Sequence, residues 1–247
     1  MIKNTNRSGS ILLSAALLTA LSTVGLYQGG KFLWGEDAVP FFKGILRDPK
    51  TNGAFTPCSR FVADDITKPL HALRGAVQVL EVGAGTGQFS KRAYVILKDL
   101  LDKNIITEFH LDLVEIDAAY CDILRKKFAD MPEITVHCAD VTTLSKADNY
   151  YDAIISAVPF TRMSVDVVDS ILKSYVRMVK PCGSLSYVEL MWLPNIKKTI
   201  LSFAHKEAET VAMISLLKDF QAHYKVETHK VWMNITPAYV HHLSIAK

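Results

Sequence analysis

The chain has 247 residues, a net charge of +3, 49% hydrophobic residues and a mean hydropathy of +0.16. This composition excludes a polar, charge-rich disordered protein, and the length fits one large α/β domain or two small ones. The four cysteines are separated by 63, 17 and 44 residues, which matches no zinc or redox motif. We therefore expect Cys58, Cys121, Cys138 and Cys182 to be free thiols in a reducing compartment.

The basic surplus lies near the N-terminus, because residues 1–75 carry a net charge of +4 and residues 76–247 a net charge of −1. In the same part, residues 11–27 carry no charge, and 12 of the 17 are apolar. This run is marginally short for a transmembrane helix. A cleaved signal peptide, a membrane anchor or interfacial helix, and a buried core helix all remain open. Aromatic and basic residues follow closely, which favours an anchor or interfacial segment over residues 1–30 on an anionic membrane surface.

The next segment, residues 31–75, is predicted to form amphipathic helices. Asp48-Pro49 is expected to end a first short helix, because the residue before proline avoids the helical conformation. Ser59 is a candidate N-cap for a second helix that runs to about His71.

From residue 76 to residue 247, strand and helix patterns alternate. The predicted strands are Ala76–Glu81, Glu108–Glu115, Ile134–Cys138, Tyr151–Ser156, Gly183–Leu190, Lys225–Trp232 and Tyr239–Ile245. The predicted helices run from the glycine-rich turn to about Lys103 and over Ala118–Asp130, Ser164–Val179 and Lys197–Gln221. This order predicts an α/β fold with a doubly wound, Rossmann-like, mostly parallel sheet and an antiparallel edge.

A glycine-rich turn, Gly83-Ala84-Gly85-Thr86-Gly87, joins the first predicted strand to the first helix. Glycine lets the backbone approach a ligand closely, and the N–H groups of the following helix face that ligand. The spacing is G-x-G-x-G, and Gln88 stands where a dinucleotide fingerprint needs its last glycine. Because the acidic Glu81 ends the strand, the turn is typical of S-adenosylmethionine methyltransferases. We therefore expect Glu81 and the turn residues Gly83, Ala84, Gly85 and Gly87 to hold S-adenosylmethionine.

Acidic residues also follow the next two strands. Glu115 ends the second strand and is placed to accept hydrogen bonds from both ribose hydroxyls. Asp117 is better explained as a helix cap. Asp140 follows the third strand and is a candidate acceptor for the adenine amine, although a turn-forming role is nearly as well supported.

The acceptor side of the site is expected after the fourth and fifth strands, where Ser156, Pro159, Tyr187 and Glu189 are the candidate catalytic residues. Methyl transfer needs alignment of nucleophile and methyl group, together with carboxylate or aromatic groups near a nitrogen that gains positive charge. The eight histidines show no ligand spacing such as H-E-x-x-H, so no catalytic metal is predicted.

Four segments are similar to bacterial phospholipid N-methyltransferases, a family that also resembles the ribosomal RNA adenine dimethylases. They are FFKGILRDPKTNGAFTPCSRFVA, VLEVGAGTGQFS, ISAVPF and VWMNITPAYV, and the resemblance spans roughly residues 41–243. Ala157 stands where the family tends to have glycine, and Thr236 where it tends to have proline. The family also often shows a Gln and a Tyr-Gly pair after the fifth strand, where this chain has YVELMW.

The resemblance implies methyl transfer from S-adenosylmethionine to the amine of phosphatidylethanolamine or its partly methylated forms. The expected partners are an anionic phospholipid membrane and an amine-bearing lipid, on the cytoplasmic face where the cofactor is found. Nucleic acid is not expected, because the sequence lacks an N-x-P-[FY] motif and a basic C-terminal domain. A methyltransferase for RNA, protein or a small amine, and a catalytically silent membrane-associated protein, remain alternatives. The sequence leaves the oligomeric state open.

Overall fold

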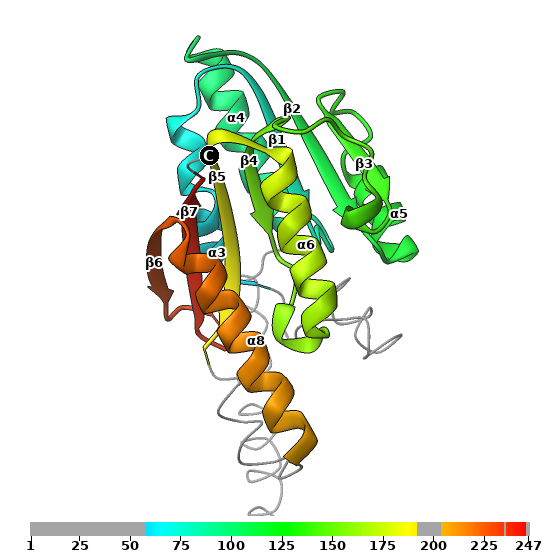
Figure 1. Ribbon diagram of the computed structural model, residues 1–247. Helices are drawn as coiled ribbons and strands as arrows, with labels where there is room; N and C mark the ends of the chain where they lie inside the picture. Colours follow the sequence, from blue (N-terminus) through cyan, green and yellow to red (C-terminus); the bar gives the residue numbers. More distant parts are fainter. Residues whose placement is uncertain (1–57, 192–203, 235, 246–247) are drawn as a thin grey trace, which may run out of the picture.

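The computed structural model describes residues 58–191, 204–234 and 236–245 (Figure 1). The predicted N-terminal segment 1–30, most of the predicted helical stretch 31–75 and the start of the predicted helix from Lys197 lie outside these residues. Within the described ranges, no helix combines the length and the apolar character needed to cross a bilayer.

A seven-stranded sheet forms the centre of the molecule, with the strand order β3-β2-β1-β4-β5-β7-β6. The strands are β1 (Gly75–Val82), β2 (Ile106–Glu115), β3 (Ile134–Cys138), β4 (Tyr151–Ser156), β5 (Val179–Leu190), β6 (Lys225–Val231) and β7 (Ala238–Ser244). β1 to β5 are parallel, β7 is antiparallel to β5, and β6 is antiparallel to β7. All seven strands predicted from the sequence are present, and the predicted antiparallel edge is confirmed.

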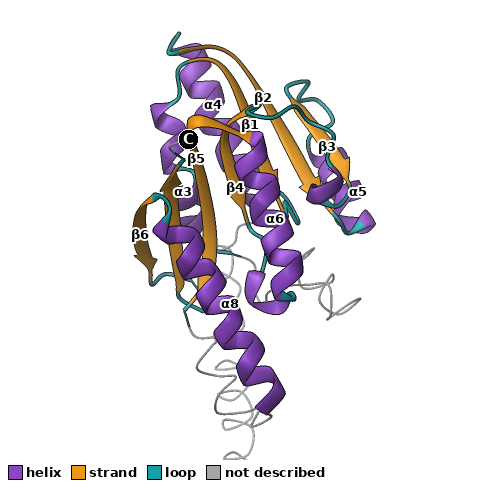
Figure 2. Cartoon of the chain, in the orientation of Figure 1, coloured by secondary structure: helices purple, strands orange, loops and turns teal. Residues whose placement is uncertain are grey.

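Helices cover both faces of this sheet (Figure 2). The helices are α3 (Arg60–Ile66), α4 (Gln88–Asp102), α5 (Ala118–Lys127), α6 (Val165–Met178) and α8 (Ala204–Ala222), with short 3-10 turns η2 (Lys68–Ala72), η3 (Val141–Thr143) and η4 (Phe160–Arg162). Side chains of α3, α4 and α5 share one apolar cluster with the sheet, whereas those of α6 and α8 share a second cluster. The fold is therefore doubly wound.

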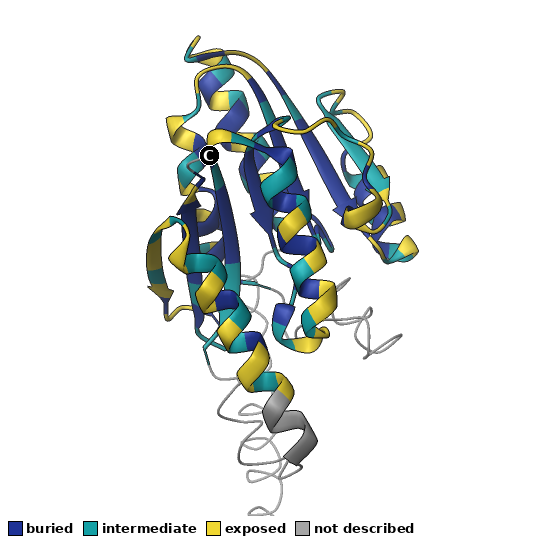
Figure 3. Cartoon of the chain, viewed as in Figure 1, coloured by how far each residue is buried: buried dark blue, intermediate teal, exposed yellow. Residues whose placement is uncertain are grey.

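The central strands are apolar on both sides because both sheet faces are covered. On β1, Val77 and Val79 belong to the cluster with α4, and Leu80 and Val82 belong to the cluster with α6. Figure 3 shows these strands in the buried colour, with exposed residues concentrated on the outer sides of the helices. This burial fixes the positions of the strand ends, where the polar residues of the site lie.

Helix α3 belongs to the same core as the sheet, although the sequence placed it in a separate segment ending at residue 75. Val62 and Ile66 of α3 and Leu70 of the following turn η2 are at most 1% exposed and pack in the cluster that contains β1. Ser59 precedes α3 as predicted, but its hydroxyl makes no capping bond; its backbone N–H instead donates to Asn234 Oδ1 at 2.7 Å. The start of the described chain is thereby tied to the β6–β7 connection.

The expectation of four free thiols is wrong for one pair, because Cys121 and Cys138 form a disulfide. Cys121 lies in the first turns of α5 and Cys138 ends β3, beside Glu115 of β2. The parallel pairing of β2 and β3 brings these two distant positions together, which a spacing of 17 residues alone does not reveal. Cys58 and Cys182 are free.

Candidate functional site

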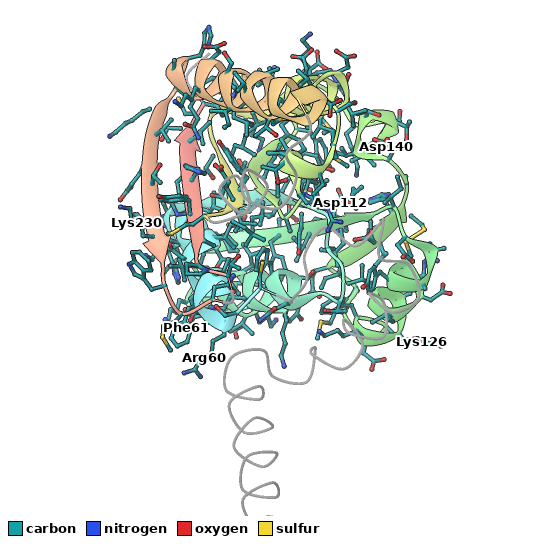
Figure 4. All side chains as sticks on the ribbon, turned by 90° about the horizontal axis from the view of Figure 1, so that it is seen from below. Arg60, Phe61, Asp112, Lys126, Asp140 and Lys230 are labelled. Carbon is teal, nitrogen blue, oxygen red and sulfur yellow. A yellow bond between two sulfur atoms is a disulfide. The ribbon has the colours of Figure 1, made fainter. Side chains whose placement is uncertain are left out.

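A pocket with a volume of about 270 Å³ opens at the carboxyl ends of the parallel strands. Its walls come from the ends of β1, β2 and β5 and from the segments that follow β3 and β4. β1 and β4 are neighbours, and the chain proceeds from them in opposite directions across the sheet. Ligands of open α/β sheets bind at this kind of switch point. Figure 4 views the molecule from this edge, with Asp140 on the β3 side and Lys230 on the β6 edge.

The glycine-rich turn forms the floor of the pocket, and its glycines adopt left-handed backbone conformations. Gly83, Gly85 and Gly87 have φ values of 74°, 54° and 82°. A Cβ on Gly83 would lie 3.4 Å from the backbone of Ala157, whereas a Cβ on Gly85 would meet nothing within 4 Å. Gly83 therefore permits close packing of β1 against the β4 end, and Gly85 leaves open space above the turn for a ligand.

Glu81 is a buried carboxylate at the end of β1. Its side chain is part of the pocket lining, the residue is 1% exposed, and Oε2 has no hydrogen-bond partner in the part of the chain that the structure describes. Burial raises the pKa of Glu81 to about 8. A buried polar atom without a partner is costly, so this oxygen fits a ligand that brings a cationic donor, such as the amino group of S-adenosylmethionine.

Glu115 lies at the end of β2, opposite the glycine turn. Oε2 accepts a hydrogen bond from the Gly85 N–H at 2.8 Å, and Oε1 accepts from the Ile116 and Asp117 N–H groups at 2.8 and 2.9 Å. A carboxylate offers about four lone-pair positions, so these three bonds leave roughly one for a ribose hydroxyl. Glu115 thus fixes the turn as well as lining the pocket, a contact that the sequence did not indicate.

Asp117 and Asp140 cap local structure as they line the pocket. Asp117 Oδ1 accepts from the Ala119 and Tyr120 N–H groups at the start of α5, which confirms its predicted capping role. Asp140 Oδ1 accepts from the Thr142 N–H and hydroxyl, both at 2.8 Å. Asp140 therefore forms the turn η3 and reaches the pocket from its rim, so both of its predicted roles remain compatible with the structure.

Lys127 lies on α5 and stabilises the glycine-rich turn. The sequence did not predict this contact. Its ammonium donates to the Thr86 carbonyl at 2.9 Å and to the Gly87 carbonyl at 3.5 Å. Tyr120 and Cys58 also line the pocket and were not predicted. Desolvation raises the pKa of the Cys58 thiol to about 12, so it is not a thiolate nucleophile at neutral pH.

Glu189 lines the pocket on the β5 side, and its partner is His241 of β7. Glu189 Oε2 lies 3.3 Å from His241 Nε2, and His241 Nδ1 lies 2.9 Å from the Thr228 hydroxyl. A neutral imidazole with its hydrogen on Nε2 donates to Glu189 and accepts from Thr228, which orients the carboxylate. Among the described residues, Glu189 Oε1 has no hydrogen-bond partner and is free to meet a ligand.

Tyr187 lines the same wall, with its ring between Phe160 and His241 at centroid distances of 5.5 and 4.8 Å. Its hydroxyl accepts a hydrogen bond from Gln221 Nε2. Burial raises the pKa of Tyr187 well above its ordinary range, so the phenol stays neutral. Tyr187 therefore supplies an aromatic wall and not a proton acceptor.

The structure brings Pro159 into the pocket but not Ser156. Pro159 lines the cavity and directly precedes η4, where its carbonyl accepts from the Arg162 N–H at 2.9 Å. Ser156 is fully buried, does not line the pocket, and its hydroxyl bonds the Tyr175 hydroxyl of α6 at 2.9 Å. Ser156 therefore joins β4 to α6 and is not placed to touch a substrate.

The charged side chains that line the pocket are all acidic. Among the described residues, no lysine, arginine or histidine contributes to the lining. The acidic residues are Glu81, Glu115, Asp117, Asp140 and Glu189. Such a pocket favours cationic ligands and disfavours anionic ones.

Comparisons with known proteins agree with this architecture. Residues 79–183 match the family described as a methyltransferase domain. A malonyl-[acyl-carrier protein] O-methyltransferase from Ilyobacter polytropus is 29% identical over 118 residues, which is 48% of this chain and 40% of that protein. The chain thus matches less than half the length of this relative.

Two solved structures illustrate the similarity of fold. The N-methyltransferase NodS from Bradyrhizobium japonicum, in complex with S-adenosyl-L-homocysteine, has a TM-score of 0.58 and 12% identity, covering 84% of this chain and 100% of NodS. A class I methyltransferase from Listeria monocytogenes, itself described as putative, has a TM-score of 0.58 and 14% identity, covering 84% and 65% of the two chains. At these identities the structures show the fold alone.

The molecule therefore has the fold of the class I S-adenosylmethionine-dependent methyltransferases, as predicted. The expected cofactor, S-adenosylmethionine, is confirmed by the matched domain and the structural neighbours. The relatives named here include no phospholipid N-methyltransferase, so the narrower resemblance remains a prediction.

Proposed function

We propose that this protein is an S-adenosylmethionine-dependent N-methyltransferase that acts on the amine head group of phosphatidylethanolamine or its partly methylated forms. The observation that carries the amine acceptor is that every charged side chain lining the pocket in the described part of the chain is acidic. The lipid is supported by the sequence resemblance and by the apolar and basic N-terminal stretch. An anionic membrane surface on the cytoplasmic side is the proposed partner and location.

S-adenosylmethionine supplies a methyl group on a positively charged sulfur, which passes to a nucleophile by direct displacement. In this chain, Glu81 and the open space above Gly85 fit the amino-acid part of the cofactor, and Glu115 fits its ribose. These residues would accelerate methyl transfer mainly by fixing the position of the cofactor relative to the acceptor.

Glu189 is the residue that we assign to the acceptor nitrogen. An ammonium group must lose a proton before its nitrogen can attack, and a carboxylate at the pocket wall both attracts the ammonium and receives that proton. His241 holds Glu189 Oε2, so we assign this task to Oε1. The rings of Tyr187 and Phe160 stabilise the positive charge that develops on the methylated nitrogen.

The rim of the pocket supports a lipid acceptor. Met163 and Val167 are 39% and 44% exposed, and both line the cavity. Exposed apolar side chains at a pocket mouth fit contact with acyl chains or the bilayer surface. A short, fully polar amine would leave these side chains unused.

A carboxylate acceptor is the competing function, because the curated relative is named as an O-methyltransferase of a malonyl group. Among the residues that the structure describes, an anionic acceptor would meet no cationic side chain in this pocket and would face Glu189. The pocket charge therefore favours the amine.

The deciding experiment is transfer of labelled methyl groups from S-adenosylmethionine by the full chain. The acceptors are liposomes with and without phosphatidylethanolamine and, in a third arm, malonyl-[acyl-carrier protein]. Mass analysis of methylated lipid, formed only when phosphatidylethanolamine is present, is the expected result. Labelled malonyl ester without labelled lipid, in protein that binds the cofactor, would refute the proposal.

A second experiment tests the proposed membrane contact. Deletion of residues 1–30 is expected to move the protein from the membrane pellet to the supernatant and to lower turnover on liposomes, with turnover on a detergent-dispersed lipid retained. A truncated protein that pellets as fully as the intact chain would contradict this role for the segment.

A further inference from the structure

Three potential metal ligands converge on the opposite side of the sheet from α6 and α8. They are Asp65 of α3, His229 of β6 and His242 of β7, and one ligand atom from each lies within 4.8 Å of the other two. None of them lines the pocket. We refer to these three residues as the α3–hairpin cluster, because they join α3 to the β6–β7 hairpin.

Two neighbours hold the imidazole rings by their other nitrogens. His242 Nδ1 lies 2.8 Å from the Ser186 hydroxyl, and His229 Nε2 lies 2.8 Å from Glu227 Oε1. Donation from His242 Nδ1 leaves a lone pair on His242 Nε2, whereas His229 Nδ1 faces Asp65 Oδ1 and must release a proton before it can bind a metal ion. Hydrogen bonding of the outer nitrogen to a carboxylate or hydroxyl is how metal-binding histidines are oriented in proteins.

His242 carries the observation that points to a missing ligand. The residue is 9% exposed, and its Nε2 has no hydrogen-bond partner among the described residues. The ring also packs edge-on against His229, with 5.1 Å between ring centroids, so its position is fixed. A buried nitrogen without a partner calls for an explanation, and an unseen ion is one of the established ones.

The cluster already attracts a positive charge. The Lys68 ammonium contacts Asp65 Oδ1 and lies 3.4 Å from His229 Nδ1. Asp65 Oδ1 is also 2.8 Å from His229 Nδ1, which requires a proton or a cation between these two acceptor atoms. The Lys68 side chain is 57% exposed, so it can leave the cluster and remain hydrated.

We propose that the α3–hairpin cluster binds a zinc ion, with His229 Nδ1, His242 Nε2 and an Asp65 oxygen as protein ligands and water as the fourth. Two imidazoles and one carboxylate suit Zn²⁺, whereas Mg²⁺ and Ca²⁺ prefer oxygen ligands alone. Because the cluster is outside the pocket and its members are far apart in the sequence, the ion acts as a cross-link between α3 and the sheet edge. It takes no part in methyl transfer.

The test is titration of Zn²⁺ into the full chain after removal of metals with a chelator, followed by calorimetry in two buffers with different ionisation enthalpies. One ion is expected to bind per chain in the micromolar range or tighter, with release of about one proton as His229 Nδ1 becomes a ligand. Mg²⁺ at the same concentration is expected to give no heat. Co²⁺ is expected to show the visible absorption of a four-coordinate site.

Single substitutions test which residues bind the zinc ion. His229→Ala and His242→Gln are each expected to weaken zinc binding at least 100-fold, and Lys68→Met to tighten it roughly tenfold because the competing ammonium is gone. His71→Ala, which removes an exposed histidine one turn from Lys68, is the matched control and is expected to bind like the wild type. Circular dichroism in chelator checks that every variant is folded.

Three outcomes would overturn the proposal. They are the absence of saturable zinc binding in both the wild type and Lys68→Met, equal affinity of the wild type and a folded His229→Ala variant, and loss of binding in His71→Ala. Zinc binding is measured without substrate or cofactor. Failure of this inference is therefore distinguishable from failure of the proposed methyl transfer.

Discussion

Replacement of Glu81 by glutamine tests whether this buried carboxyl group binds the cofactor. Burial raises its pKa from 4.5 to about 8, a difference that corresponds to about 5 kcal/mol. Since the pKa is higher in the folded than in the unfolded chain, the stabilising contribution of the protonated form is complete below pH 4.5. It is lost progressively as the pH rises to about 8. In the ligand-free protein, the buried charge of Glu81 therefore lowers the free energy of unfolding mainly at alkaline pH.

Glu81→Gln removes this destabilisation. The variant is expected to equal the wild type in unfolding free energy near pH 5 and to exceed it by a few kcal/mol at pH 9, measured by urea denaturation without ligand. At the same time the variant loses a carboxyl group that can ionise when the cationic amino group of the cofactor binds, so S-adenosylmethionine affinity at pH 7.5 is expected to fall about 10- to 100-fold by calorimetry.

Glu108→Gln is the matched control, because Glu108 is an exposed glutamate on β2 and the substitution changes the net charge equally. It is expected to leave both the pH dependence of stability and cofactor affinity unchanged. A Glu81→Gln variant that is less stable than the wild type at pH 9, or that binds S-adenosylmethionine with wild-type affinity, would refute the reasoning.

Four further outcomes are expected. Gly85→Val should abolish cofactor binding, whereas Gly75→Val, at a glycine with φ of 73° outside the pocket, introduces comparable backbone strain and should retain it; calorimetry distinguishes the two. Glu189→Gln should lower turnover roughly 100-fold with little change in cofactor affinity, and a kcat that keeps its wild-type value and pH profile would remove Glu189 from the proton transfer. Ser156→Ala should cost about 1–3 kcal/mol in urea denaturation while turnover stays within about twofold of the wild type, since its hydroxyl bonds only inside the core. Cys121→Ser should lower the unfolding free energy by about 3 kcal/mol under oxidising conditions, and equal stability in the presence and absence of reductant would argue against a structural disulfide.

The cofactor side of the site could be predicted from the sequence because its parts are local. Glu81 and the glycines lie within seven consecutive residues, and Glu115 is marked by its place at a strand end. The same locality made all seven strands predictable, since each has its own apolar pattern. The pairing of Glu115 with the Gly85 N–H, across 30 residues, has no such pattern.

The acceptor side was predicted less well, because position at a strand end does not say whether a side chain is long enough to reach the pocket. Ser156 and Tyr187 are paired neighbours on β4 and β5, yet only Tyr187 reaches the pocket. His241 orients Glu189 from an antiparallel strand 52 residues further along the chain. Likewise, the members of the α3–hairpin cluster are separated by 164 and 13 residues, so no spacing motif reveals them.

The strand order has a consequence for how this fold diversifies. β1 and β2 carry the residues assigned to the cofactor, whereas β5 and the segment after β4 carry those assigned to the acceptor, and the boundary between the two groups runs between adjacent strands β1 and β4. Substitutions on one side of that boundary leave the other side's backbone in place, because each strand is anchored by its own buried apolar residues. A lineage with this scaffold can therefore exchange acceptors by altering β5 and its surroundings while keeping one inherited methyl donor.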